Sequence, residues 1–287
     1  MGVYEFVIIS GKGGTGKTTF VSSLIPCLDD LVIADCDVDA PDLDILIQST
    51  LKREEDFFGL EKATIDQSKC IQCGKCINSC NFSAINKNIE INLLKCEGCS
   101  VCTVVCPTNA IQMIKSKTGT FYQSTSKYGE VFHAKLIPGE EASGKLVSKI
   151  RKEAKYFAKN NSKKYIIIDG SPGIACNVIS SIIGTKKAIV VVEPTISGVH
   201  DLKRVYELLS KYPIESFVVI NKYNLSLKKT KEIESFCKEN NISIGLKIPF
   251  DKRIVQAIVE KKIPSIKEKE FFENIGFFEF LEKLKNN

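Results

Sequence analysis

The sequence predicts an α/β fold: a mostly parallel, doubly wound sheet with a small cysteine-rich α+β domain inserted into it. Three observations lead to this prediction. Short apolar runs alternate with stretches of helical periodicity, which is typical of a parallel sheet covered by helices on both faces. A glycine-rich turn follows the first apolar run, and two cysteine runs interrupt the alternation after the second. With 287 residues and 44% hydrophobic content, the chain can fill one large core and one small module.

The expected strands are short apolar runs, and the first of them is followed by helical spacing over residues 16–28. Residues 118–137 alternate polar and apolar side chains around Tyr128 and Gly129, which predicts a hairpin leading back into the large domain. The large domain is therefore expected to be discontinuous, with residues 1–61 and 116–287 on either side of an insertion at 62–115. The runs predicted to be strands are residues 4–10, 31–35, 165–169, 187–192, 214–220 and 242–247.

The turn after the first apolar run has the spacing of a phosphate-binding loop. Residues 11–18 read Gly-Lys-Gly-Gly-Thr-Gly-Lys-Thr and lie between a predicted strand and a predicted helix. Glycines in this position let backbone N–H groups close around phosphate oxygens at the start of the helix. Lys17 is expected to reach the β- and γ-phosphates, and the Thr18 hydroxyl to ligate Mg²⁺. The predicted nucleotide-binding residues of this loop are Gly11, Lys12, Gly13, Gly14, Thr15, Gly16, Lys17, Thr18 and Thr19.

A second lysine, Lys12, makes this loop resemble the deviant Walker A loop of the MinD/ParA/Mrp class of ATPases, which includes the nitrogenase iron protein. The resemblance implies ATP and Mg²⁺ as ligands, and a homodimer that forms with ATP. In that dimer Lys12 would reach the partner's phosphates and cancel charge during phosphoryl transfer. The resemblance also implies catalytic roles for Lys12, Lys17 and Asp37, with Asp37 orienting the attacking water.

Four further motifs fit this class in chain order. They are Leu-Val-Ile-Ala-Asp-Cys-Asp at 31–37, Tyr-Ile-Ile-Ile-Asp-Gly-Ser-Pro-Gly at 165–173, Val-Val-Ile-Asn-Lys at 218–222 and Ile-Pro-Phe-Asp at 248–251. By resemblance, Asp35 is a carboxylate on the Mg²⁺ side, and Asp169 holds Mg²⁺ through water. Asn221 matches the residue that reads the adenine edge, and Pro249 belongs to the segment that packs against the base from the other side.

Two cysteine runs of identical spacing, C-x2-C-x2-C-x3-C, predict two [4Fe–4S] clusters. Residues 63–114 resemble a bacterial-type ferredoxin, in which the fourth cysteine of each run ligates the other cluster. One departure is Asn81, where that family usually has proline. Zinc is the alternative for C-x2-C pairs, but two four-cysteine runs around a short β-like stretch at 88–92 favour clusters. The implied ligands are Cys70, Cys73, Cys76 and Cys106 for cluster one, and Cys96, Cys99, Cys102 and Cys80 for cluster two.

Charge and hydropathy restrict the partners. The formal net charge is +6, but each oxidised cube with its thiolates contributes about −2, so the holoprotein lies near +2, which disfavours nucleic acid. No signal peptide or long apolar span is visible, and a cytoplasmic location in a low-oxygen host is expected. The tail at 271–284 is expected to pack on the sheet as a helix rather than bind a membrane, because its polar face mixes Glu with Lys.

Three functions remain open at this stage. The first is ATP-gated electron transfer from the clusters to a redox partner. The second is assembly or delivery of iron–sulfur clusters to an apo-metalloprotein client; Mrp-like relatives do this, but with a paired CxxC that this chain lacks outside the cysteine runs. The third is a positioning ATPase, for which the clusters would have no role. Cys176 follows Asp169 as a cluster-ligating cysteine does in the nitrogenase iron protein, although a small buried cysteine is the commoner situation.

Overall fold

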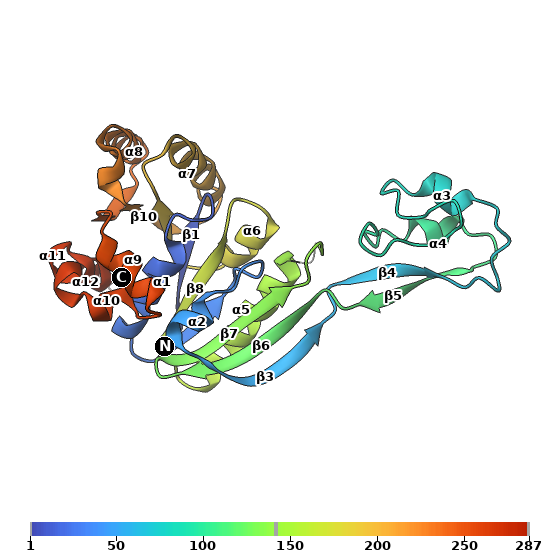
Figure 1. Ribbon diagram of the computed structural model, residues 1–287, viewed down its shortest axis with the longest axis horizontal. Coiled ribbons are helices and arrows are strands. Elements are labelled where there is room, and N and C mark those ends of the chain that lie inside the picture. Colours follow the sequence, from blue (N-terminus) through green and yellow to red (C-terminus); the bar gives the residue numbers. More distant parts are fainter. Residues whose placement is uncertain (1, 141–142, 286–287) are drawn as a thin grey trace.

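The large domain is built on a nine-stranded sheet with the strand order β11-β10-β9-β1-β8-β2-β7-β6-β3. The structure is a computed structural model that describes residues 2–140 and 143–285 (Figure 1). The six apolar runs predicted to be strands are confirmed, each within one residue at its start, and they lie parallel to one another. The parallel strands are β1 (Tyr4–Ser10), β2 (Leu31–Asp35), β7 (Gly129–Leu136), β8 (Tyr165–Pro172), β9 (Lys187–Val192), β10 (Glu215–Asn221) and β11 (Ser243–Ile248).

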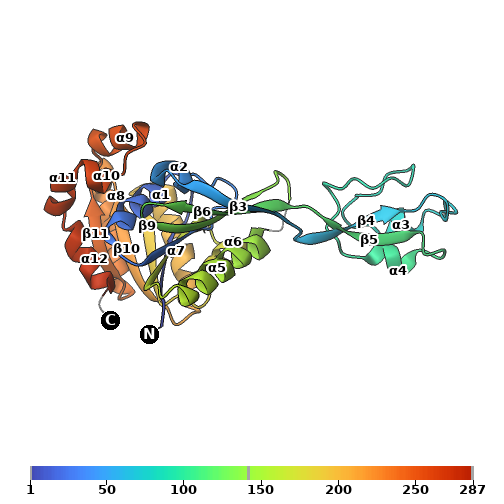
Figure 2. The ribbon, with the colours of Figure 1, turned by 90° about the horizontal axis from the view of Figure 1, so that it is seen from below.

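Helices cover both faces of this sheet, as the alternating pattern predicts (Figure 2). On one face lie α5 (Ser143–Asn160), α6 (Cys176–Ile182), α7 (Ile196–Leu209) and α8 (Leu227–Glu239). On the other face lie α1 (Lys17–Leu24), α2 (Leu43–Ile47), α10 (Pro264–Lys267), α11 (Lys269–Asn274) and α12 (Phe277–Lys285), while α9 (Lys252–Val259) follows β11. Because each face of the sheet is apolar, burying both supplies most of the core.

The C-terminal tail packs on the sheet, as expected, but as two helices. The chain breaks between α11 and α12 at Gly276, whose φ of 75° is a left-handed conformation that favours glycine. Phe272, Phe277 and Phe280 are buried in the core of that face. The apolar side of the tail is therefore used inside the domain. Among the described residues, no helix is both long enough and apolar enough to span a membrane.

An antiparallel extension follows the parallel part of the sheet. The predicted hairpin is present as β6 (Gly119–Ser126) and β7, although the turn residues are Lys127 and Tyr128 and Gly129 already begins β7. The outermost strand, β3 (Thr50–Phe57), pairs with β6. This strand was not predicted from the sequence. Its segment, Thr-Leu-Lys-Arg-Glu-Glu-Asp-Phe, is mostly exposed, because an edge strand needs only one neighbour and charged side chains protect its free edge.

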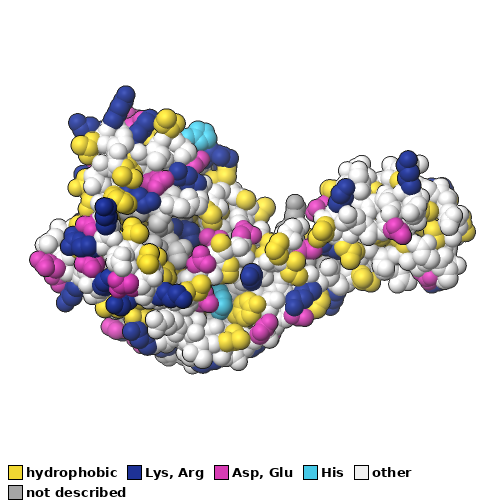
Figure 3. Space-filling view, in the orientation of Figure 1, with side chains coloured by type: hydrophobic (Ala, Val, Ile, Leu, Met, Phe, Trp, Pro, Cys, Tyr) yellow, Lys and Arg dark blue, Asp and Glu magenta, His cyan; other side chains and the backbone are white. Residues whose placement is uncertain are grey.

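The inserted module (residues 60–116) stands apart from the sheet on a two-stranded neck, and the space-filling view shows it as a separate lobe (Figure 3). The neck consists of β4 (Leu60–Ile65) paired with β5 (Ile111–Ser116). These strands continue β3 and β6 with only two residues between each pair of strands. Beyond the neck, each cysteine run contains one short helix, α3 (Lys75–Ser79) or α4 (Val101–Val105). The stretch at 88–92 forms only an isolated bridge between Ile85 and Ile91.

A buried ion pair holds the neck against the large domain. Lys62 of β4 lies 2.6 Å from Glu140, which follows β7, and the two side chains are only 3% and 7% exposed. The same ammonium group donates to the Leu93 carbonyl at 2.6 Å. Nearby, the Lys145 ammonium group donates to the Gly59 carbonyl at 2.9 Å. The neck is therefore fixed by polar contacts in addition to its strand pairing.

We expect Lys62→Ala to loosen the module, because it leaves the Glu140 carboxylate buried without a partner. Breaking one side of a buried pair costs about 3–5 kcal/mol. Limited proteolysis should then cut the neck much faster, and the module should lose its cluster absorbance at a lower temperature. Lys117→Ala is the matched control, since the Lys117–Asp56 pair lies at the same neck with side chains 41% and 51% exposed. Equal behaviour of the two variants would contradict a fixing role for Lys62.

Candidate nucleotide and cluster sites

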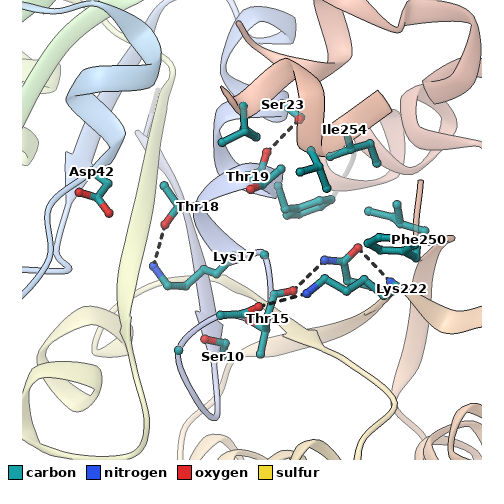
Figure 4. A pocket seen from close by; sticks show the side chains of 18 of the residues that line it. Ser10, Thr15, Lys17, Thr18, Thr19, Ser23, Asp42, Lys222, Phe250 and Ile254 are labelled. Carbon is teal, nitrogen blue, oxygen red and sulfur yellow. Dashed lines mark hydrogen bonds between the residues drawn. The ribbon is translucent and has the colours of Figure 1, made fainter. Parts of the chain in front are cut away.

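A cavity of about 620 Å³ opens at the carboxyl ends of the parallel strands, beside the loop between β1 and α1. Figure 4 shows Lys17 and Thr18 across this cavity from Phe250 and Ile254. Gly16 has a φ of 90°, and this left-handed conformation turns the loop into the first turn of α1. Among the described residues, the Thr15 hydroxyl is buried in the loop without a hydrogen-bond partner. Ten predicted residues line the cavity: Gly13, Gly14, Thr15, Gly16, Lys17, Thr18, Thr19, Asp37, Asn221 and Pro249.

Lys17 lies at the centre of a carboxylate cluster. Its ammonium group contacts Asp169 in a short hydrogen bond and lies 3.5 Å from Asp37. Burial alone would lower the pKa of Lys17, but the charges of Asp169, Asp37 and Asp35 outweigh it and raise the pKa. Burial raises the pKa of Asp37 and of Asp35, and the Lys17 charge offsets part of both shifts. Asp37 and the Thr18 hydroxyl both line the cavity, so these two groups could contribute ligands to a Mg²⁺ ion bound there.

Asp35 is placed to organise the loop that carries Asp37. It is 1% exposed, and its two oxygens accept backbone N–H bonds from Asp37 at 3.0 Å and from Leu43 at 3.4 Å. Asp169 is equally buried and lies opposite Asp35 on the adjacent strand β8. Neither residue lines the cavity wall: Asp169 contacts Lys17, and Asp35 binds the backbone of Asp37. Their charges thus act on the cavity through Lys17 and Asp37.

Two predicted residues of the loop face away from the cavity. Gly11 lies against α7, where a Cβ would come within 2.4 Å of the Asp201 Cβ, so glycine is needed there for packing. The Lys12 ammonium group turns to Glu193 at 2.8 Å and to the Ser197 hydroxyl at 3.0 Å. The Lys12 ammonium group therefore binds residues that follow β9, and Lys12 is not among the residues that line the cavity. This arrangement is compatible with the expectation that Lys12 acts on the phosphates of a partner protomer.

The far wall of the cavity is apolar, as a nucleobase site requires. It is formed by Phe250, Pro249 and the α9 residues Ile254, Val255 and Ile258. Asn221 lies at the end of β10, and its amide group donates to the Thr15 carbonyl at 2.7 Å. In this structure Asn221 therefore anchors the phosphate loop from the side where the base is expected.

The eight cysteines of the module line two separate cavities. One cavity is lined by Cys70, Cys73, Cys76 and Cys106 and the other by Cys80, Cys96, Cys99 and Cys102. The fourth cysteine of each run thus lies with the first three of the other run, as the ferredoxin resemblance implies. Among the described residues, no three His, Cys, Asp or Glu side chains converge closely enough for a single metal ion. Four cysteines line each cavity, which is the number of thiolates that a [4Fe–4S] cubane needs.

Backbone N–H groups support the crossing cysteines. The Ala84 N–H donates to Cys80 at 3.4 Å, and the Ala110 N–H donates to Cys106 at 3.3 Å. Burial raises the pKa of Cys106, but the N–H groups of Thr108 and Ala110 together outweigh it and lower the pKa. Hydrogen bonds to sulfur stabilise the thiolate, which is the form that ligates iron. These residues therefore fit an iron–sulfur cluster at each cavity.

Two further observations lie outside the sequence predictions. Cys176 begins α6 and is exposed, so the expectation of a small buried cysteine is wrong. Glu193, at the end of β9, had no predicted role, yet it pairs with Lys12 and also with Lys222 at 3.2 Å. Its position directly after a buried parallel strand could have marked it, because ligand-binding residues gather at those strand ends.

Comparisons with known proteins agree with this division into two parts. A family profile described as a 4Fe-4S dicluster domain matches residues 63–113. MinD of Pyrococcus horikoshii, solved with Mg-ADP, superposes with a TM-score of 0.57 at 16% identity, covering 99% of this chain and 96% of MinD. McdA of Cyanothece superposes with a TM-score of 0.59 at 16% identity, covering 99% of this chain and all of McdA. Both likenesses concern the fold.

Sequence relatives cover both the whole chain and the module. Protein MJ0578 of Methanocaldococcus jannaschii is 34% identical over 99% of this chain and 97% of its own length. Pyruvate synthase subunit PorD of Methanothermobacter marburgensis is 38% identical over 69 residues, which are 24% of this chain and 85% of PorD.

The large domain has the fold of MinD, and the inserted module matches a 4Fe-4S dicluster domain. The chain belongs to the family that includes MJ0578.

Proposed function

We propose that this protein binds and hydrolyses ATP and that its nucleotide state controls electron transfer from two [4Fe–4S] clusters to a partner protein. The supporting observation is the short connection between the two domains that carry the sites. Only Phe58 and Gly59 separate β3 from β4, and only Lys117 and Thr118 separate β5 from β6. The Lys62–Glu140 pair adds a buried tie at the same place. A flexible carrier domain would need a linker, whereas this neck passes movement of the large domain to the clusters.

The nucleotide site supports the ATPase part of the proposal. Lys17 and Thr18 stand where phosphates and Mg²⁺ would bind, and Asp37 lies at the cavity wall. A carboxylate in this place is suited to orient water rather than to hold the nucleotide. ATP is proposed to join two protomers through their loops, with Lys12 of each reaching the other's phosphates.

Asp37→Ala should separate binding from hydrolysis. We expect the variant to bind ATP about as well as the wild type but to turn it over at least roughly 100-fold more slowly, because the water loses its orienting group. A stable ATP dimer near twice the 31.9 kDa chain mass should then accumulate in light scattering. The Asp37→Ala/Lys12→Ala variant should remain a monomer. If Asp37→Ala hydrolyses ATP at the wild-type rate, Asp37 does not orient the attacking water.

The coupling itself is tested by the clusters' redox behaviour. EPR-monitored titrations of anaerobic Asp37→Ala protein without nucleotide, with ADP and with ATP should give different cluster potentials or different electron-transfer rates to an artificial acceptor. The Lys17→Ala variant serves as the control at nucleotide concentrations that saturate the Asp37→Ala protein but are too low for the weaker binding of Lys17→Ala. Identical potentials and rates in all nucleotide states would contradict the proposed coupling and show that the nucleotide site and the clusters act independently.

Cluster delivery to an apo-protein is the second candidate, and one observation favours it. Each cluster cavity includes one exposed cysteine, Cys73 in the first and Cys99 in the second. An exposed ligand gives an incoming thiol a point of attack. Transfer of iron and sulfide to an apo-ferredoxin, faster with ATP than without, would support this candidate. Clusters retained through many ATP turnovers would favour electron transfer.

A further inference from the structure

Glu193 binds two lysines that belong to the nucleotide site. One carboxylate oxygen lies 2.8 Å from the Lys12 ammonium group, and the other lies 3.2 Å from that of Lys222. The glutamate side chain is 13% exposed, and the two lysine side chains are 31% and 30% exposed. Burial would raise the pKa of Glu193, but hydrogen bonds from Lys12 and Lys222 outweigh it and lower the pKa. Glu193 is therefore a charged, partly enclosed clamp between β9 and the phosphate loop.

Glu193 lies in a hydrogen-bonded turn that leads from β9 into α7. The Glu193 carbonyl accepts the Thr195 N–H at 2.8 Å, and the Thr195 hydroxyl caps α7 by accepting the Gly198 N–H at 2.9 Å. The Lys12 ammonium group also donates to the hydroxyl oxygens of Thr195 at 3.4 Å and of Ser197 at 3.0 Å. The Lys12 ammonium group thus has three partners between the end of β9 and the start of α7. Its position is defined by contacts that would have to break before it could reach another molecule.

The second lysine connects the clamp to the loop itself. The Lys222 ammonium group donates to the Gly14 carbonyl at 3.3 Å while it pairs with Glu193. Lys222 follows Asn221, whose amide group holds Thr15. When Lys12 leaves, Lys222 remains as a partner, so the carboxylate of Glu193 does not become a buried unpaired charge. This second partner lowers the cost of opening the clamp.

We propose that Glu193 is the resting partner of Lys12: it holds Lys12 away from the two-fold interface until ATP-bound protomers meet, and so sets the ATP concentration at which they pair. This inference rests on the proposed ATP dimer. It assigns Glu193 a positioning role through Lys12, without contact to the nucleotide. Releasing Lys12 converts an internal ion pair into one between protomers, so the internal pair opposes dimerisation in each protomer.

The resting contact is tested without any dimer. Nucleotide-free wild type and Glu193→Gln are treated briefly with an amine-acylating reagent, and labelling of each lysine is followed by mass spectrometry. Lys12 should label several-fold faster in Glu193→Gln, while exposed Lys261 should label equally in both. Glu260→Gln is the matched control, because Glu260 likewise bridges two lysines, Lys262 at 2.9 Å and Lys267 at 2.8 Å, and is not among the residues that line the cavity. Unchanged labelling of Lys12 in Glu193→Gln would overturn the proposal.

The consequence for pairing is tested in the Asp37→Ala background. Adding Glu193→Gln should tighten the ATP-dependent dimer by roughly tenfold, about threefold for each of two protomers, which is the size expected for a partly exposed ion pair. The gain should persist when Lys222→Ala is also present, because it acts through Lys12, and Glu260→Gln should give none. A weaker dimer in Glu193→Gln would show that Glu193 assists Lys12 instead of restraining it. If Lys12 labels faster in Glu193→Gln but no variant forms a dimer with ATP, the proposed dimer is wrong. The contact between Glu193 and Lys12 would still be supported, but its proposed control of pairing would be rejected.

Discussion

The Cys73→Ala/Cys106→Ala variant is expected to keep one [4Fe–4S] cluster, whereas Cys99→Ala/Cys106→Ala is expected to keep neither. Cys73 and Cys106 line the same cavity, so the first variant damages one cluster site only. Cys99 lines the other cavity, so the second variant damages both. Anaerobic wild-type protein should hold about eight iron and eight sulfide per chain, and the two variants about four and close to none. Iron and sulfide analysis with EPR of the reduced proteins measures this.

The opposite pattern would show that each cysteine run binds its own cluster. In that case Cys73→Ala/Cys106→Ala would lose both clusters, because it would break one ligand in each run. Stoichiometric zinc without sulfide would reject the ferredoxin assignment altogether. Cys176→Ala is a suitable control, since this exposed cysteine lies in the large domain and should leave the iron content unchanged.

Lys17→Ala is expected to weaken ATP binding by roughly 10- to 100-fold, the value of one charged hydrogen bond to phosphate. It should also destabilise the nucleotide-free protein, because Asp169, Asp37 and Asp35 then lose their shared cation. Breaking a buried pair of this kind costs about 3–5 kcal/mol. Nucleotide binding by calorimetry and thermal unfolding measure the two effects, and Lys12→Ala should retain ATP binding by the monomer.

The destabilisation of Lys17→Ala should depend on pH and Mg²⁺. Burial raises the pKa of Asp35 and Asp37 in the folded protein, so the folded state binds more protons than the unfolded state as these groups titrate. Stability then falls as pH rises through the folded-state pKa values, and the loss in Lys17→Ala should be larger at neutral than at mildly acidic pH. Mg²⁺ should restore more stability to Lys17→Ala than to wild type. A pH-independent loss would contradict electrostatic repulsion as its cause.

Local patterns were sufficient for the elements whose residues are close in sequence. The phosphate loop between β1 and α1 and the apolar central strands follow from composition and spacing, because backbone geometry and burial on both faces restrict which residues those places accept. The charged strand β3 carries no such pattern. It is a strand because β6 offers it a free edge, and that neighbour comes from a distant part of the chain.

The sequence by itself determined the class of the fold, the insertion of a two-run cysteine module, and the residue types that surround a phosphate and an iron–sulfur cluster. The tertiary structure decided how those residues are used. It paired Lys62 with Glu140 at the neck, turned Lys12 towards Glu193, and set Asp169 against Lys17 outside the cavity wall. These contacts join residues far apart in the chain, and single surface or buried charges leave no periodic signal. Only the packing of the sheet brings them within reach of one another.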